Sequence, residues 1–332
     1  MGSTSQNRQL KSNDLKPSDR NPLVTIAIPT FNRLNLLKEA ILSASSQSYK
    51  NLEIIVSDNF SSDGTMDFLK QLKDSRIRVN INTKNIGMVG NWQQCLDMAQ
   101  GEYFLMMSDD DKFLSNDAIL KMTEGFKVGY EEVVGAVFAG VVIRKEHKNS
   151  ETVSFNDIEY DQPWKLISDF YSNKIAIYPC ATMLRTKNIR SLGGYIGFGA
   201  TLAVDACIWI SAILNYGKAV FINEALCMYR IHDSLSSSAV EVMDQDFLIM
   251  RNLIEGHESI RLNLLAKREI KKQMDCAWNR IPLGYCVRRY RYKKGAEKNS
   301  DIYKNIWRWK RRIFSLSNIR HLSNHFFKFL NG

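Results

Sequence analysis

Apolar segments typical of buried strands alternate with segments of helical periodicity along residues 23–111 of this chain. Strands are expected at 23–28, 52–56, 77–81 and 103–107, with helices between them at 34–46, 66–72 and 90–100. This alternation predicts an α/β fold with a doubly wound, mostly parallel sheet and helices on both faces. Because ligands of such sheets bind beyond the carboxyl ends of the strands, the functional residues are expected there.

Three of these strands end in polar residues, at Pro29-Thr30-Phe31, Ser57-Asp58-Asn59 and Ser108-Asp109-Asp110-Asp111. Carboxylates directly after a buried strand are costly unless a cation neutralises them, and Mg²⁺ or Mn²⁺ prefer carboxylate oxygens. In an extended turn, Asp109 and Asp111 point the same way and can share one ion. The alternative is a solvated acidic turn that caps the next helix. The position of the triplet favours a metal site, and the three strand ends are expected to meet in one crevice.

Three further residues are candidates for chemistry, each with a structural alternative. Asp58 either accepts the imide N–H of uracil or thymine, or caps the next turn through Ser62. Asp205 lies in the first turn of a helix expected at 203–216, where it either stabilises the helix dipole or acts as a general base. His232 is either a packed histidine or a metal ligand. Short strands are expected at 220–222 and 226–229.

The charge of the chain separates a slightly acidic body from a basic tail. The net charge is +10, but residues 267–332 hold 18 Lys and Arg against 4 Asp and Glu. Aromatic residues are interleaved with these cations, a pattern typical of helices that bind an anionic membrane surface. Nucleic-acid binding and a solvated helical face are the alternatives, and nucleic acid is less favoured than membrane.

Apolar runs and cysteines indicate the compartment. Residues 1–22 contain no apolar run that suits a signal peptide, and the longest run, 133–143, has 11 residues where a membrane span needs about 20. The six cysteines have neither paired zinc spacing nor the density of a disulfide scaffold. We therefore expect a cytoplasmic protein that binds the inner face of the cell membrane peripherally.

Four motifs occur in order along residues 22–238, at 24–33, 52–65, 85–87 with 101–111, and 204–205 with 229–232. Together they resemble the inverting glycosyltransferase family 2, which has the GT-A fold and includes enzymes of bacterial surface polysaccharide synthesis. The acidic motif departs from the family pattern, because it reads Ser-Asp-Asp-Asp instead of Asp-x-Asp-Asp, so the pair of aspartates that binds the ion stays open. Val204 also replaces the usual Glu before Asp205.

The resemblance implies a role for each matching residue. Thr30, Phe31, Asp58, Asn85 and Asp110 would bind the nucleotide-sugar donor, with Asp58 on the base and Asp110 near the ribose or sugar. Asp109, Asp111 and His232 would hold Mn²⁺ or Mg²⁺, and Asp205 would be the catalytic base. The donor would be linked to UDP, dTDP or GDP, and the acceptor would be a glycan or a lipid-linked glycan.

The expected organisation is a flexible N-terminus at 1–21, a glycosyltransferase domain at 22–238, and a helical, basic and aromatic region at 239–332. Within the domain, residues 22–143 would bind the nucleotide-sugar and residues 144–238 the acceptor. Two other functions stay open. One is a sugar nucleotidyltransferase, disfavoured because residues 29–33 contain no glycine. The other is a non-catalytic protein that binds nucleic acid through the basic tail.

Overall fold

One mixed sheet organises the part of the chain that the computed structural model describes, which is residues 21–127, 134–145, 150–153, 158–160, 162–231 and 240–292. Its strands are β1 (Val24–Thr30), β2 (Leu52–Asp58), β3 (Ile77–Ile81), β4 (Tyr103–Met106), β5 (Lys112–Phe113), β6 (Val134–Lys145), β7 (Glu151–Val153), β8 (Ile158–Tyr160), β9 (Thr182–Arg185) and β10 (Lys218–Ile231). Their order is β3-β2-β1-β4-β9-β6-β10-β5, with β7 on β6 and β8 on β10. The strands β3, β2, β1 and β4 run parallel, as predicted. The predictions for residues 1–20, His232 and 293–332 lie outside the described residues.

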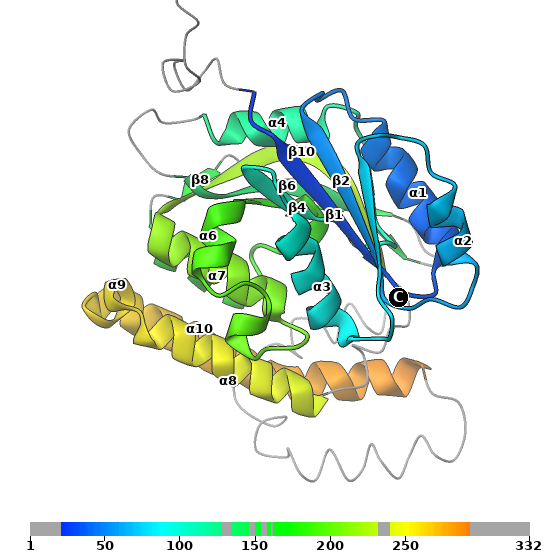
Figure 1. Ribbon diagram of the computed structural model, residues 1–332. Helices are drawn as coiled ribbons and strands as arrows, with labels where there is room; N and C mark the ends of the chain where they lie inside the picture. The colour runs from blue at the N-terminus through cyan, green and yellow to red at the C-terminus, as the bar shows by residue number, and fades with distance from the viewer. Residues whose placement is uncertain are drawn as a thin grey trace, which may run out of the picture.

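Helices cover both faces of this sheet, which confirms the predicted architecture (Figure 1). They are α1 (Leu34–Ser45), α2 (Thr65–Lys70), α3 (Gly87–Met98), α4 (Ala118–Gly125), α5 (Pro163–Tyr171), α6 (Thr186–Ser191), α7 (Val204–Tyr216), α8 (Val240–Gly256), α9 (Glu258–Arg261) and α10 (Leu264–Tyr292). The helices α1, α2 and α4 pack on one face, and α3, α5, α6 and α7 pack on the other. The C-terminal helices α8 and α10 pack against α7 and α5.

Strand β1 shows why the strands of the parallel half of the sheet could be predicted from runs of apolar residues. Ile26 and Ile28 belong to the core under α1, whereas Ala27 belongs to the core under α3 and α7. All seven residues of the strand are buried. A strand that is covered on both faces needs apolar residues throughout instead of an alternating pattern.

The short strands expected at 220–222 and 226–229 are one strand, and that prediction was wrong. Strand β10 pairs with β6 along its length, with shifts of register between Ile222 and Ala225 and between Ala225 and Cys227. The polar pair Asn223-Glu224, between the two predicted runs, lies in this irregular stretch. A β-bulge holds extra residues without ending the strand, so a local polar interruption does not separate two strands.

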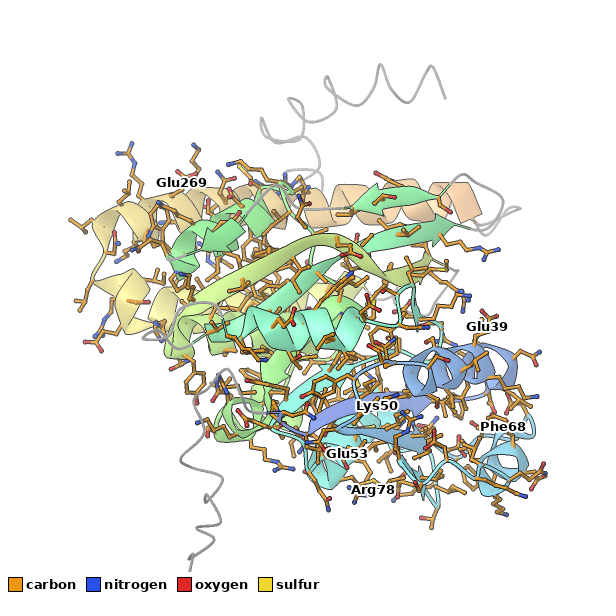
Figure 2. All side chains as sticks on the ribbon, turned by 90° about the horizontal axis from the view of Figure 1, so that it is seen from above. Glu39, Lys50, Glu53, Phe68, Arg78 and Glu269 are labelled. Carbon is orange, nitrogen blue, oxygen red and sulfur yellow. The ribbon has the colours of Figure 1, made fainter. Side chains whose placement is uncertain are left out.

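A buried carboxylate closes the amino end of the sheet, opposite the predicted site (Figure 2). Glu53 accepts hydrogen bonds from the Thr25 hydroxyl at 2.6 Å, from the N–H groups of Gln100 and Gly101 at 2.6 and 3.0 Å, and from Arg78 at 2.9 Å. Burial alone would raise the pKa of Glu53, but these bonds hold it below its usual range. This end of the sheet is therefore a satisfied structural anchor.

Candidate active site

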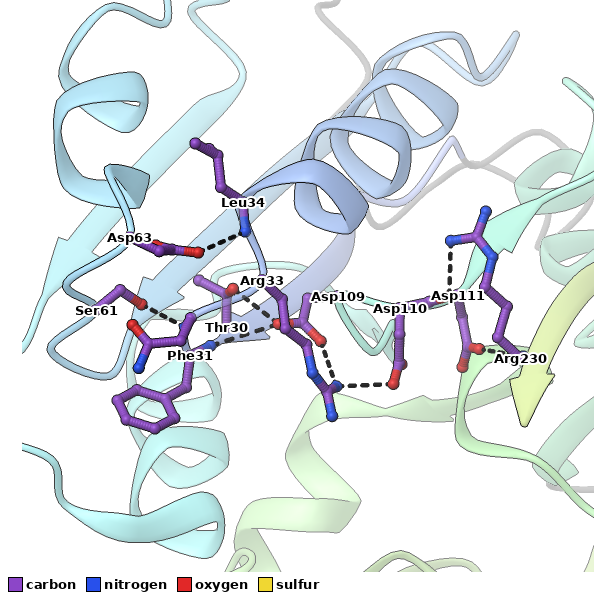
Figure 3. Close-up of polar contacts among 11 residues, drawn as sticks. Thr30, Phe31, Arg33, Leu34, Ser61, Asp63, Asp109, Asp110, Asp111 and Arg230 are labelled. Atoms are coloured by element: carbon purple, nitrogen blue, oxygen red, sulfur yellow. Dashed lines mark hydrogen bonds and ion pairs between the residues drawn. The ribbon is translucent and has the colours of Figure 1, made fainter. Parts of the chain in front are cut away.

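The carboxyl ends of β1 and β4 bring Thr30 next to Asp109 (Figure 3). The Thr30 hydroxyl donates to Asp109 Oδ2 at 2.8 Å, and the Phe31 N–H donates to the same oxygen at 3.4 Å. Thr30 and Asp109 are buried, whereas the Phe31 side chain is 42% exposed. The first and fourth strand ends therefore meet in space, as predicted.

The acidic triplet forms a tight turn instead of the extended turn that we expected. The Asp111 N–H donates to the Ser108 carbonyl at 3.1 Å. As a result, Asp109 and Asp110 converge on one cation, the Arg33 guanidinium, at 2.9 and 2.7 Å. Asp111 points elsewhere and accepts the Arg230 N–H at 3.0 Å (Figure 3). The structure thus brings Asp109 together with Asp110 and not with Asp111.

Asp111 has unused acceptor capacity. Its Oδ2 atom is buried and has no hydrogen-bond partner within the described ranges. Burial, and then the charge of Asp110, raise the pKa of Asp111 to about 8, and the backbone N–H of Arg230, followed by the Cys180 thiol, opposes this shift only in part. Burial also raises the pKa of Asp109, although Arg33 opposes the shift. A buried carboxylate oxygen without a donor is the kind of group that a hard divalent cation satisfies.

The described residues fit a metal site that the substrate completes. None of them forms a preassembled group of three acidic, histidine or cysteine ligands. Mg²⁺ is usually held by one or two carboxylates together with substrate phosphates, so such a group is not required. Asp111 offers a free oxygen, and Asp109 would have to exchange its bond to Arg33 for the ion.

Asp58 is completely buried at the end of β2, next to the end of β1. Both of its carboxylate oxygens accept the Ser61 N–H, at 3.3 and 3.2 Å. The turn-capping alternative therefore holds in this structure, with Ser61 in place of the expected Ser62. A role for Asp58 on a nucleobase stays a prediction.

Asn85 joins the end of β2 to the start of α3. Its Oδ1 atom accepts the Gly87 N–H at 2.8 Å and the Asn59 side-chain amide at 2.9 Å. Asn59 in turn accepts the Ile86 N–H at 2.9 Å. Gly87 has a positive φ of 78°, and a Cβ there would meet no atom within 4 Å. The loop is thus held in shape by asparagines and is open beside Gly87, as a ligand-binding loop requires.

Asp205 lies in the first turn of α7, as predicted from the sequence. Its side chain is half-buried. It lines a small pocket whose other walls are mostly apolar and include Phe104, Met106, Leu184, Tyr195, Ile208 and Trp209. Burial raises the pKa of Asp205 to about 6, which the N–H of Ala206 opposes and the charge of Asp246 supports. A carboxylate with this pKa can accept a proton near neutral pH.

The acidic turn and the Asp205 pocket both adjoin strand β4. Burial is the main cause that raises the pKa of Tyr229, and the charges of Asp111, Asp110 and Asp205 all add to it. Met106, in the wall of the Asp205 pocket, is the last residue of β4, which leads into the acidic turn. The proposed base and the acidic turn therefore lie around the carboxyl end of β4.

Three residues of this region were given no role from the sequence, namely Arg33, Asn59 and Arg230. Arg33 and Asn59 each stand beside a predicted strand end, and that position was the available signal. Arg230 reaches Asp111 across 119 positions, so no local pattern indicates the contact.

Comparison with known proteins decides the family. The model of glycosyl transferase family 2 matches residues 25–191, half of the chain. The chain belongs to glycosyltransferase family 2. Two relatives support this. The GalNAc(5)-diNAcBac-PP-undecaprenol beta-1,3-glucosyltransferase of Campylobacter jejuni is 29% identical over 86% of the chain and 88% of the relative. The UDP-Glc:alpha-D-GlcNAc-diphosphoundecaprenol beta-1,3-glucosyltransferase WfaP of Escherichia coli is 37% identical over 72% of the chain and 90% of the relative.

Solved structures confirm the GT-A fold of this glycosyltransferase. Staphylococcus aureus TarS 1–349 in complex with UDP superposes with a TM-score of 0.62 at 14% identity, covering 88% of the chain and 81% of TarS. The mannosyltransferase PcManGT from Pyrobaculum calidifontis, in complex with GDP-Man and Mn²⁺, gives a TM-score of 0.55 at 14% identity, covering 93% of the chain and 85% of PcManGT. Membership of the family favours sugar transfer over a nucleotidyltransferase or a nucleic-acid-binding protein.

Proposed function

We propose that this glycosyltransferase moves a sugar, with inversion, from a nucleotide-diphosphate donor to a hydroxyl of a lipid-linked glycan in the assembly of a bacterial surface polysaccharide. The observation that carries the proposal is the match to two enzymes named for transfer to diphosphoundecaprenol-linked acceptors, each covered over at least 88% of its length. WfaP is named for UDP-glucose, so a UDP-sugar is the first donor to test.

Asp205 is the proposed base. Of the residues described as lining its pocket, it alone carries a carboxylate. It would take the proton of the acceptor hydroxyl while that oxygen bonds to the anomeric carbon and the bond to the diphosphate breaks. One base without a second carboxylate nucleophile supports a single displacement, which inverts the anomeric configuration.

The donor would lie across the ends of β1, β2 and β4. Asp58 and Asn85 stand at the end of β2, where we place the nucleoside, and Thr30 and Phe31 stand at the end of β1. Asp110 would face the ribose or sugar. Asp109 and Asp111, with His232, would hold Mn²⁺ or Mg²⁺, which when bound neutralises charge on the leaving diphosphate.

We place the acceptor-binding half at residues 144–238, after a nucleotide-binding half at 22–143, with the basic region from 239 as the membrane contact. In the described ranges, none of the helices has the length and apolarity to cross a bilayer. The corner between α9 and α10 lies at the lower left of Figure 1. Apolar and basic side chains are exposed at this corner. Leu262, Leu264 and Leu265 are 70%, 82% and 65% exposed there, beside the exposed Arg261, Lys267, Arg268 and Lys271. Exposed leucines flanked by cations suit the surface of an anionic membrane on the cytoplasmic side.

Replacing Leu262, Leu264 and Leu265 by serine is expected to lower binding to vesicles that contain anionic lipid by at least about tenfold, because each buried leucine contributes about 1.5–3 kcal/mol. Co-sedimentation measures the effect. Leu42→Ser is the matched control, because Leu42 is 68% exposed on α1, away from this corner. Deleting residues 285–332 is expected to weaken binding further. Equal pelleting of the wild type, the triple serine variant, Leu42→Ser and the deletion variant would contradict the membrane proposal.

The catalytic proposal is tested by nucleotide release from a panel of UDP-, dTDP- and GDP-sugars, with Mn²⁺ or Mg²⁺ and a lipid-diphosphate-linked glycan acceptor. We expect metal-dependent release from one donor by the wild type, and release that is about 10²–10⁴-fold slower by Asp205→Asn. Equal release by the two proteins would remove Asp205 from the chemistry. Direct titration of UDP, dTDP and GDP against the protein separates a missing acceptor from a missing donor site.

A further inference from the structure

Asp246 is a buried carboxylate in α8 that the proposed reaction does not use directly. It is only 2% exposed, and it accepts three backbone N–H groups, from Thr201 at 2.9 Å, Leu202 at 2.5 Å and Ala203 at 2.8 Å. Hydrogen bonds from three consecutive N–H groups offset the cost of burying the charge.

These three residues lead directly into α7, whose first turn carries Asp205. The cap residue of α7 is Ala203, and no side-chain hydrogen bond comes from the cap itself. Asp246 supplies the acceptor from another helix, and its charge complements the positive end of the α7 dipole. The contact therefore fixes where α7 begins and, with it, the position of Asp205.

We infer that Asp246 is a positioning residue for sugar transfer, and that α8, in the C-terminal helical region, is a required part of the active site. This inference rests on the proposed role of Asp205 as the base. It assigns Asp246 two effects: it holds the segment 201–203 in place, and it places a negative charge near Asp205.

The negative charge of Asp246 changes the pKa of Asp205, an effect that a purely structural cap would not have. Burial is the main cause that raises the pKa of Asp205, and the charge of Asp246 raises it further. The other described titratable groups that interact with Asp205 are Tyr195, Cys207 and Tyr229, and burial raises the pKa of each, so they stay neutral near pH 7. Loss of the Asp246 charge is therefore expected to lower the pKa of Asp205.

The test compares Asp246→Asn with Glu255→Gln, which removes the same charge from α8 at a surface ion pair with Arg251. For Asp246→Asn we expect faster hydrogen exchange of the amides 201–203, and a kcat/KM for nucleotide release that is about 10–100-fold lower. The acid limb of its pH profile should move down by on the order of half a pH unit. The Glu255→Gln enzyme should match the wild type in all three measurements.

An Asp246→Asn enzyme that is slower but keeps the acid limb in place would make Asp246 a structural cap only and overturn the inference. Unchanged exchange of the amides 201–203 would also overturn it. If the asparagine variant does not fold, Asp246→Glu decides, because it keeps the charge but displaces the carboxylate. We then expect a lower kcat with the limb unmoved, and full activity would contradict the inference. Failure of the proposed function would appear instead as no donor-dependent release by the wild type, and failure of the base assignment as full activity of Asp205→Asn. The exchange measurement does not depend on either.

Discussion

Replacing Asp205 by asparagine is expected to lower sugar transfer by about 10²–10⁴-fold, the usual contribution of a general base. Donor affinity should be retained, because Asp205 lies in the apolar pocket and not at the ends of β1 and β2. Asparagine keeps the shape of the side chain but cannot accept the hydroxyl proton. Single-turnover transfer measures the rate of the chemical step, and a separate donor titration measures the donor affinity.

The same substitution is expected to stabilise the fold at neutral pH. Burial raises the pKa of Asp205 from 3.8 to about 6 in the folded protein. Above pH 6 the carboxylate is ionised in both the folded and unfolded states, and only the folded state bears the cost of burying the charge. The gain from Asp205→Asn should be on the order of 1–2 kcal/mol above pH 6, and it should disappear as the pH falls toward 4. Thermal unfolding at pH 7.5 and pH 5 measures it.

Asp67→Asn is the matched control, because Asp67 also lies in the first turn of a helix, α2, but is exposed. It should leave the rate of sugar transfer unchanged and give no gain in stability at pH 7.5. The wild-type rate should fall as the pH drops below about 6, when Asp205 becomes protonated. An Asp205→Asn enzyme that is inactive but less stable than the wild type at pH 7.5 would show that the carboxylate is a structural partner and not a strained base.

Replacing Asp111 by asparagine is expected to remove most of the stimulation by Mn²⁺ or Mg²⁺ and to lower the metal-dependent rate by about 10²-fold, because charge neutralisation by a metal contributes several kcal/mol. The fold should persist, since the asparagine carbonyl can still accept the Arg230 N–H that bonds to Asp111 at 3.0 Å. Nucleotide release measured against metal concentration gives both the maximal stimulation and the metal affinity.

Two further variants make this prediction specific. Asp109→Asn should have a similar effect, although it also removes one of the two carboxylates that pair with Arg33 and leaves Asp110 as the other. Asp117→Asn removes an exposed carboxylate a few residues beyond the acidic turn, paired with Lys121 at 3.7 Å, and should leave the metal response unchanged. A wild-type metal response in the Asp111 variant would remove that residue from the metal site and favour the Asp109–Asp110 pair.

The parts of this fold that follow from local pattern could be predicted, and the parts that depend on distant contacts could not. The strand at Val24–Thr30 and the helix at Val204–Tyr216 follow from apolar runs and periodicity. The geometry of the acidic turn did not follow, because it depends on a backbone hydrogen bond from Asp111 to Ser108 and on the distant partners Arg33 and Arg230. A residue pattern fixes which carboxylates are present, but not which of them face one another.

The contact of Asp246 with the start of α7 also could not be predicted from the sequence. It lies in a helix with no motif of its own, and its contact with Thr201 spans 45 positions. Only the folded chain shows that a carboxylate in α8 caps the helix that carries Asp205. Arg33 is a partial case, because it directly follows the predicted strand end, yet its partners Asp109 and Asp110 lie 76 and 77 positions away.

The anomeric configuration of the product tests the proposed chemistry most directly. With the donor found in the nucleotide panel and a lipid-diphosphate-linked glycan acceptor, the anomeric proton of the transferred sugar is observed by NMR. We expect the configuration opposite to that in the donor, so an α-linked UDP-sugar should give a β-linked product. Retention of the donor configuration would contradict a single displacement with Asp205 as the base.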